Sequence, residues 1–285
     1  MGQIIEYMRR MLLASVACIP VLSGCTYEKG ITRPDTGRQV TFSINIPGRS
    51  VPDTRALGDG EENEVQTIEM LLFDPNSGEV VGNPVFANNI STDADDIRKK
   101  TFTVRLPEGT FDAMIFANAR KVFNDAGVIA SGDGREETLA KLTTTMPASG
   151  WATNPADADK KYLIPMWGMK ENLTVGQGTS ISGIWLHRML SRIDLSVTGD
   201  DAFTGYFKLK DIKLHNVQKE GRIAPATANW NAAGKINGTV QAGLATAPSL
   251  VAGCGVHPAI SYAGAIVGEK SCTGEMYLFE APKAA

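Results

Sequence analysis

The chain has few of the residues from which metal sites and catalytic centres are built. Its 285 residues include 3 His and 4 Cys, scattered rather than grouped at the spacings of a zinc module. A glycine-rich phosphate loop, a nucleophile elbow and a complete calcium loop are also missing. The sequence therefore predicts no catalytic residue, no metal site and no cofactor. An exported enzyme would require His187 or His215 to meet an acidic side chain in a cleft.

An excess of charge of one sign is missing as well. There are 28 Lys and Arg against 31 Asp and Glu, a formal net charge of −3. Proteins that bind nucleic acid carry a basic excess, so we expect no nucleic-acid partner. Hydrophobic residues make up 43% of the chain and charged residues 21%, which is a globular composition rather than a disordered or collagen-like one.

No apolar run reaches the length of a membrane-spanning helix. The stretch from Met11 to Leu22 would span only about 18 Å as a helix, whereas a bilayer core is about 30 Å thick. It follows Arg9 and Arg10, which is the order found in a secretory signal. Its end, Leu22-Ser-Gly-Cys25, is similar to the bacterial lipobox.

The lipobox resemblance implies that residues 1–24 are a signal peptide and that Cys25 is lipidated. Two or three acyl chains on Cys25, palmitate among them, would anchor the protein stably. Thr26 rather than an aspartate follows, which under the sorting rule of enteric bacteria predicts the outer membrane. Residues 25–38 would form a tether to the folded part. A general secretory signal with an incidental cysteine is the alternative.

The body of the chain is patterned as β-strands. Residues 39–47 alternate strictly between apolar and polar side chains. The inner face of this predicted strand carries Val40, Phe42, Ile44 and Ile46. Residues 101–106 alternate in the same way, whereas residues 65–74 and 111–119 are nearly continuous apolar runs, typical of central strands.

Alternation also predicts strands in the last third of the chain. Residues 193–197 alternate, with Ile193 and Leu195 on the inner face. Residues 206–217 alternate with one slip in phase, which predicts a strand with a β-bulge and Phe207 inward.

The predicted fold class is all-β. Strands at regular spacing, with turn residues between them, predict β-sandwiches. We expect an N-terminal sandwich over residues 39–187 and a second, short or incomplete sandwich over residues 188–285. Helical signal is thin and concentrates in residues 133–142, with Asp133 as N-cap, so one or two short helices are expected in the first domain.

Two cysteines remain in the predicted second domain. Cys254 and Cys272 could form a disulfide in an oxidising compartment, or stay as two buried thiols. Their spacing permits the disulfide and does not decide between the two.

Four segments carry a family resemblance when they are taken together and in order. They are the joint Asp53-Thr-Arg-Ala-Leu-Gly-Asp-Gly-Glu-Glu62 with the strand Ile68–Asp74, then Phe116-Ala-Asn-Ala-Arg120, Ile164-Pro-Met-Trp-Gly168 and Leu186-His-Arg-Met-Leu-Ser-Arg-Ile-Asp-Leu195. They resemble the fimbrillin family, the major and minor subunits of type V pili in Gram-negative anaerobes. The resemblance covers residues 41–217 and is weak after residue 219.

This resemblance implies two transthyretin-like Greek-key β-sandwiches in tandem. It also implies a place in a surface fimbria, with a role in adhesion, other fimbrial subunits as partners and export as an outer-membrane lipoprotein. It further implies cleavage by an arginine-specific protease after the first strand. The matching bond here is Arg55–Ala56, with Arg49 as a second candidate. Residues 49–64 are polar and without periodicity, as expected of an exposed, cleavable segment.

Loss of the first strand would open a site for assembly. Its four inner side chains represent about 6–12 kcal/mol of burial, at about 1.5–3 kcal/mol each. The vacated groove would carry unpaired backbone groups, which a strand from a neighbouring subunit can fill by β-strand addition. This hypothesis fails if the strand lies in the middle of its sheet with residues 49–64 packed inside.

The end of the chain leaves its role within a fimbria open. Relatives usually continue beyond the strand at 275–280, with further strands that complete the second sandwich and supply the donor. This chain ends at Ala285, so the second domain is either unusually small or shortened. The alternatives to a shaft subunit are then a terminal or accessory subunit, a non-functional fragment, or an anchor that keeps its lipid because Arg55–Ala56 stays uncut.

A surface glycan-binding β-sandwich lipoprotein is the alternative function. It would need Trp151 and Trp230, which lie in predicted loops, to be exposed on one face. Trp167 and Trp185 lie in apolar runs and are expected in the core.

Overall fold

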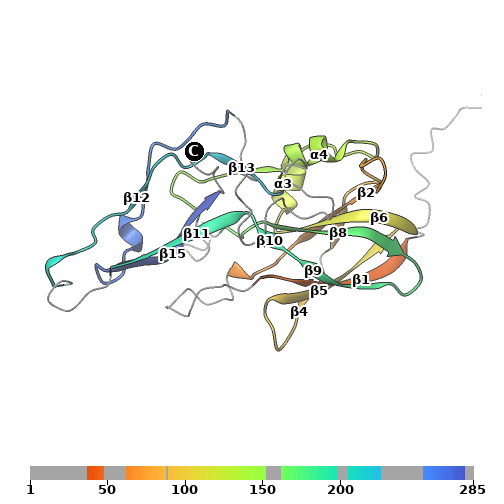
Figure 1. Cartoon of the computed structure of the whole chain (residues 1–285), viewed down its shortest axis with the longest axis horizontal. Helices are drawn as coiled ribbons and strands as arrows, with labels where there is room; N and C mark the ends of the chain where they lie inside the picture. The colour runs from red at the N-terminus through yellow and green to blue at the C-terminus, as the bar shows by residue number, and fades with distance from the viewer. Residues whose placement is uncertain are drawn as a thin grey trace, which may run out of the picture. The chain divides into compact units, whose positions relative to one another are not determined.

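The first half of the protein is built from two packed β-sheets (Figure 1). The structure is a computed structural model that describes residues 37–47, 62–87, 89–151, 162–197, 205–225 and 253–279. One sheet has the strand order β4 (Ile90–Thr92), β5 (Lys99–Leu106), β1 (Arg38–Asn45) and β9 (Ser180–Trp185). The other has the order β10 (His187–Arg188), β8 (Met166–Val175), β6 (Gly109–Ala117), β2 (Ile68–Phe73) and β3 (Val85–Ala87). The predicted all-β fold is confirmed.

The five-stranded sheet is covered on both faces. Its inner face meets the four-stranded sheet, and the short helices α3 (Arg120–Asp125) and α4 (Arg135–Lys141) lie over its outer face (Figure 1). Phe123 of α3 packs edge-on against Phe116 of β6, with ring centroids 5.3 Å apart. Because both faces of the sheet are covered, all six residues of β2 are buried, which explains a sequence that is apolar except for Glu69.

Strand β1 has the inner face that its alternation predicts. Val40, Phe42 and Ile44 have no exposed surface and Ile46 is 1% exposed. Its neighbour β5 buries Phe102, Val104 and Leu106 in the same way. Alternation is sufficient here because one face of this sheet meets the core and the other does not.

The position of β1 in its sheet is interior. It pairs antiparallel with β5 on one side and parallel with β9 on the other. The hypothesis that β1 is released for assembly fails if two conditions hold together. The first, that β1 lies in the middle of its sheet, is met. The second concerns the connection after β1: residues 48–61 lie outside the described residues, and Glu62 and Asn63 are buried.

Beyond β10 the described strands pair two by two. They are β11 (Leu190–Ser196) with β15 (Ser271–Phe279), β12 (Lys213–Leu214) with β14 (Ile260–Ser261), and β13 (Glu220–Arg222) with β7 (Thr143–Thr145). A short 3-10 helix, η3, spans Ala263–Ala265. Since β10 joins the five-stranded sheet and β13 pairs with β7, strands meet across the predicted boundary after residue 187, which stays a prediction.

Two strand predictions in this part are wrong in detail. Within 206–217 only Lys213 and Leu214 form a strand, and Phe207 is 57% exposed. Alternation shows which residues share a face, but a strand also needs a partner strand for its backbone groups. Ile193 and Leu195 do lie on β11, yet they are 40% and 39% exposed, although the residues opposite them on β15, Met276 and Cys272, are buried.

The helix prediction is right in place and wrong at its cap. The helix α4 begins after Gly134, and Asp133 instead accepts a hydrogen bond on Oδ2 from the backbone nitrogen of Ala130. No helix in the described part of the chain is long and apolar enough to cross a membrane.

Candidate functional site

The candidate site is the space between β5 and β9 that β1 occupies, which we call the β1 slot. The inner side chains of β1, Val40, Phe42 and Ile44, fill its floor together with Ile46, the residue just after the strand. Phe42 stacks on Phe102 of β5, with ring centroids 5.1 Å apart and planes 8° from parallel. On the outer face the hydroxyl oxygens of Thr41 and Thr103 lie 3.3 Å apart, within hydrogen-bond distance.

Both edges of β1 are hydrogen-bonded. Its register with β5 runs from Arg38 opposite Leu106 to Asn45 opposite Lys99. Beyond the paired range, the backbone nitrogen of Ile46 donates to the carbonyl of Arg98 at 2.9 Å. Emptying the slot would therefore leave unpaired backbone groups on both walls, and an entering strand could satisfy both.

The wall formed by β9 is irregular. Thr41 lies opposite Ser180 and Ile44 opposite Ile184, with a shift in register between them. Gly183 has a φ of +76°, a conformation that favours glycine, and this residue absorbs the shift. The backbone nitrogen of Leu186 then donates to the carbonyl of Asn45 at 2.8 Å, so pairing continues to the end of β1.

The end of the slot where β1 begins is polar and open. A depression of about 590 Å³ lies there, lined by residues of β1, β5 and the β8–β9 turn, including Arg38, Thr41 and Thr179. Arg38 forms an ion pair with Glu108. Both side chains are about half exposed, so this pair contributes little to stability.

The other end of the slot is held by Arg188 of β10. Its Nη1 donates to the carbonyl of Pro47 at 3.1 Å, just after β1. Its Nη2 donates to Oδ1 of Asn63 at 2.5 Å, and its Nε to the carbonyl of Glu62 at 3.5 Å. One guanidinium thus joins both ends of segment 48–61, in which Arg49 and Arg55 lie.

Glu62 is held from the second half of the chain. Its Oε1 accepts hydrogen bonds from Nη1 of Arg192 at 2.5 Å and from the hydroxyl of Tyr277 at 2.6 Å. Glu62 is 6% exposed and Tyr277 is 1% exposed, so these are buried, charge-assisted bonds. Residues that follow the predicted cleavage bond are therefore tied to β11 and β15.

Asn118 holds the next residues of the same segment. Its backbone has a φ of 57°, a left-handed conformation that asparagine tolerates. Its Nδ2 donates to the carbonyls of Glu64 and Ile164, at 2.8 and 3.0 Å, and its Oδ1 accepts from the backbone nitrogen of Gln66 at 2.9 Å. The four segments of the family resemblance thus meet in space around residues 62–66.

Sequence reasoning missed the roles of Arg188, Arg192 and Asn118. The signal was present, because these residues lie inside the segments that carry the resemblance. Of the predicted site residues, the four inner residues of β1 come together in the slot. Cys25, Arg49, Arg55 and Ala56 lie outside the described residues.

Cys254 and Cys272 are free thiols in the structure. Cys272 is buried, and burial, followed by the charges of Glu275 and Asp194, raises the pKa of its thiol. Cys254 is half-buried. The arrangement matches the alternative of two thiols, except that only one of them is fully buried.

Two of the three histidines make packing or backbone contacts in the structure. His187 packs against Trp167 with ring centroids 5.4 Å apart, and burial lowers the pKa of its imidazole. His257 bonds through Nε2 to the carbonyl of Met146 at 3.0 Å. Within the described ranges there is no cluster of three or more His, Cys, Asp or Glu that could hold a metal.

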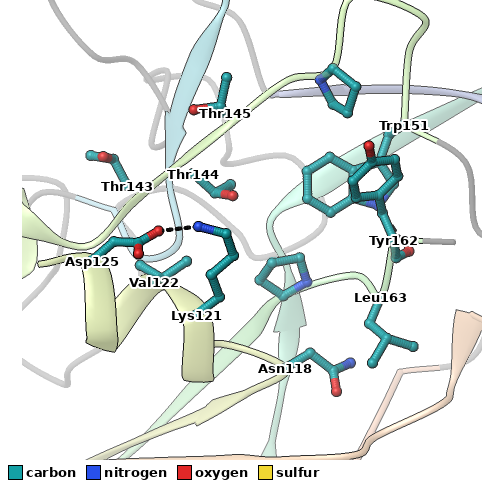
Figure 2. A pocket seen from close by; sticks show the side chains of 12 residues that line it. Asn118, Lys121, Val122, Asp125, Thr143, Thr144, Thr145, Trp151, Tyr162 and Leu163 are labelled. Atoms are coloured by element: carbon teal, nitrogen blue, oxygen red, sulfur yellow. Dashed lines mark hydrogen bonds and ion pairs between the residues drawn. The ribbon is translucent and has the colours of Figure 1, made fainter. Parts of the chain in front are cut away.

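Trp167 is buried as expected, whereas two other tryptophans do not lie where their predicted roles would place them. Trp185, expected in the core, is 54% exposed, whereas Trp151, which a glycan platform would need at the surface, is 4% exposed. Figure 2 shows Trp151 against Tyr162 at the edge of a cavity of about 520 Å³. The rings are 5.4 Å apart, and Nε1 of Trp151 donates to the carbonyl of Tyr162 at 3.2 Å. The indole is therefore packed rather than presented, and Trp230 lies outside the described residues.

Comparison with known proteins identifies the family. The family described as "Major fimbrial subunit protein (FimA)" matches residues 39–183. The chain belongs to the FimA family. The matched residues include β5, all of β1 except Arg38, and β9 as far as Gly183. A fimbrial subunit acts at the cell surface, alongside other fimbrial subunits, and its role is structural rather than enzymatic.

Two solved structures support the fold of this FimA-family chain. The tip fimbrial protein Mfa3 from Porphyromonas gingivalis, with a C-terminal truncation, matches with a TM-score of 0.51 at 18% identity. That match covers 85% of this chain and 68% of Mfa3. A putative cell adhesion protein from Parabacteroides distasonis matches with a TM-score of 0.54 at 10% identity, over 88% of this chain and 73% of that one. No curated protein sequence matches the chain.

Proposed function

We propose that this fimbrial subunit assembles by strand exchange after proteolysis. Cleavage of Arg55–Ala56 separates β1 from the rest of the fold, and a strand from another fimbrial subunit replaces it in the β1 slot. The observation that carries the proposal is that β1, the first described strand of the chain, buries its apolar inner face, so that its departure would open an apolar groove. Its interior position in the sheet counts against spontaneous release, and the proposal therefore makes release depend on cleavage.

Because β1 is paired on both sides, its release from the slot requires cleavage of the chain. While the chain is continuous, β1 stays at a very high local concentration and rebinds at once. After cleavage only non-covalent contacts retain it, and its release becomes a dissociation. Because both walls of the slot then lack partners, the empty state is costly and a competing strand is favoured.

The segment after the cleavage bond supports the same mechanism. Glu62, Asn63 and Glu64 are held by Arg188, Arg192, Tyr277 and Asn118, none of which belongs to β1. Removal of β1 together with Pro47 breaks the bond from Arg188 to the Pro47 carbonyl and leaves the bonds just named in place. The rest of the sandwich can therefore keep its shape while the slot changes occupant. Such head-to-tail contacts do not close on themselves, so they extend a filament.

The experiment uses purified chain and an arginine-specific protease. We expect N-terminal sequencing to find Ala56, and SDS-resistant ladders to follow cleavage. The matched control is the double variant Arg49→Lys, Arg55→Lys, which keeps both charges and removes both cleavage bonds. Chain that is fully cut at Arg55 and stays monomeric at high concentration contradicts assembly by strand exchange.

We further propose that Cys25 is lipidated and anchors the precursor in the outer membrane. The support is the lipobox-like end of the predicted signal peptide. Metabolic labelling with a fatty acid is expected to mark the wild-type chain and not Cys25→Ser, whereas Cys254→Ser keeps the label. Label retained by Cys25→Ser contradicts this anchor. An assembled subunit with Ala56 at its N-terminus carries no lipid.

A further inference from the structure

We infer that Arg188 sets the register of the strand that fills the β1 slot. In this role its Nη1 donates a hydrogen bond to one main-chain carbonyl at the end of the incoming strand, in the position that the Pro47 carbonyl now occupies. The inference rests on the proposed strand exchange and names the residue that positions its partner, an extended segment of another fimbrial subunit.

Arg188 is held in place independently of β1. Its backbone belongs to β10, where it lies opposite Met166 of β8, and the backbone nitrogen of Met189 donates to the carbonyl of Pro165 at 3.1 Å. Two of its side-chain bonds go to Glu62 and Asn63. When β1 leaves, these contacts remain, so Nη1 stays aimed at the end of the slot.

The chemistry of arginine suits this task. A guanidinium offers five N–H donors in a rigid planar fork, and Arg188 uses this fork to meet three acceptors from two segments. A lysine ammonium, with one nitrogen on a flexible stem, cannot hold the same three acceptors in fixed directions. A main-chain carbonyl is present in every strand, so this contact does not depend on the sequence of the partner.

The slot needs such a reference point. A slip by one residue turns the inner side chains outward and is strongly disfavoured. A slip by two residues keeps apolar side chains facing inward. The apolar floor that now holds Val40, Phe42, Ile44 and Ile46 would therefore disfavour the slipped strand only at the two ends of the slot. Nη1 of Arg188 is a fixed donor at the end of the slot, because its other nitrogens are bonded to Glu62 and Asn63. It favours the register in which a main-chain carbonyl of the incoming strand comes within hydrogen-bond distance of it.

The test is a double-mutant cycle with synthetic peptides. The peptide of residues 38–47 and the peptide of residues 38–46, both with C-terminal amides, compete for the slot of the cleaved chain. Only the longer peptide carries the Pro47 carbonyl. On the wild-type chain we expect it to bind about ten-fold more tightly, as a charge-assisted hydrogen bond implies. On Arg188→Ala this preference should disappear.

The matched control is Arg98→Ala. The Arg98 carbonyl bonds Ile46 at the same end of β1, but its side chain bonds Asp96 and not β1, so the preference for the longer peptide should survive. Equal preference for the longer peptide in wild type and Arg188→Ala overturns the inference. If Arg188→Ala does not fold, the two peptides on the wild-type chain still decide, because equal affinities overturn it as well.

A second readout separates this inference from the proposed function. The cleaved chain releases its own β1 fragment at a rate that does not depend on any replacement. We expect this release to be about ten-fold faster in Arg188→Ala than in wild type or Arg98→Ala. If no peptide enters the slot, the proposed strand exchange fails, and this rate then tests only whether Arg188 holds the end of β1 in place. Unchanged release would then overturn it.

Discussion

The hydroxyl of Tyr277 donates a hydrogen bond of 2.6 Å to Oε1 of Glu62, 215 residues earlier in the chain. This bond joins β15, the last described strand, to the first described residues after the predicted cleavage bond. It is buried and is reinforced by Arg192, which pairs with the same carboxylate oxygen. The end of the described chain therefore helps to hold the segment that proteolysis would make N-terminal.

We predict that Tyr277→Phe lowers the free energy of unfolding by about 1.5–3 kcal/mol, because a buried carboxylate loses a donor. Urea unfolding measures the difference. The matched control is Tyr262→Phe, since the buried Tyr262 hydroxyl has no hydrogen-bond partner among the described residues. Its removal should leave stability unchanged or slightly raised. Equal losses in both variants would show that the Glu62 bond is not the cause.

Phe42→Ala should lower the free energy of unfolding by about 3–5 kcal/mol, because it opens a cavity where Phe42 stacks on Phe102. In the cleaved chain it should also speed the release of the β1 fragment. The control Ser43→Ala lies on the outer face of the same strand and should change stability by less than about 1 kcal/mol. Similar effects of the two substitutions would contradict the buried inner face of β1.

The pH dependence of stability should contain a contribution from Glu69. Burial raises the pKa of its carboxyl above the ordinary 4.5, although the backbone nitrogen of Ala119 and the Arg120 side chain donate to it. Between pH 4.5 and the raised pKa the folded state holds a proton that the unfolded state has lost, so stability falls as pH rises through this window.

Unfolding measured across this window should show that slope in wild type and not in Glu69→Gln. The exposed variant Glu108→Gln reports the general effect of removing one carboxylate. A difference between wild type and Glu69→Gln that is flat, or that rises with pH, would contradict the assignment.

The thiols should differ in reactivity. In a chain with Cys18→Ser and Cys25→Ser, a thiol reagent should modify half-buried Cys254 first and reach buried Cys272, whose pKa is raised, only on unfolding. The variant Cys254→Ser should then lack the fast phase. If the unfolded chain shows no free thiol without a reductant, Cys254 and Cys272 form the alternative disulfide.

The family segments now have a physical explanation. In Phe116-Ala-Asn-Ala-Arg120, the asparagine fastens residues 64–66, while the backbone of Ala119 and the side chain of Arg120 bind Glu69. In the segment that begins at Leu186, Arg188 and Arg192 bind residues 62–63. Each segment looks weak alone because its partners lie elsewhere in the chain.

Local pattern was sufficient for strand type and inner face. The alternation of residues 39–47 is a two-residue period visible within the segment, and the nearly continuous apolar runs of β2 and β6 indicate strands that are buried on both faces. The same period failed at Phe207, where only two residues of the predicted strand found a partner. Burial of a face depends on what packs against it, and alternation carries no such information.

Neighbour relations came from packing across long separations. That β1 lies between β5 and β9, and that Arg188 reaches Pro47 across 141 residues, follows from hydrogen bonds between segments with no common periodicity. The amino-acid sequence determines which groups can donate or accept a hydrogen bond. Which donor meets which acceptor is settled when the two sheets close over one core, because only then do distant backbones come within bonding distance.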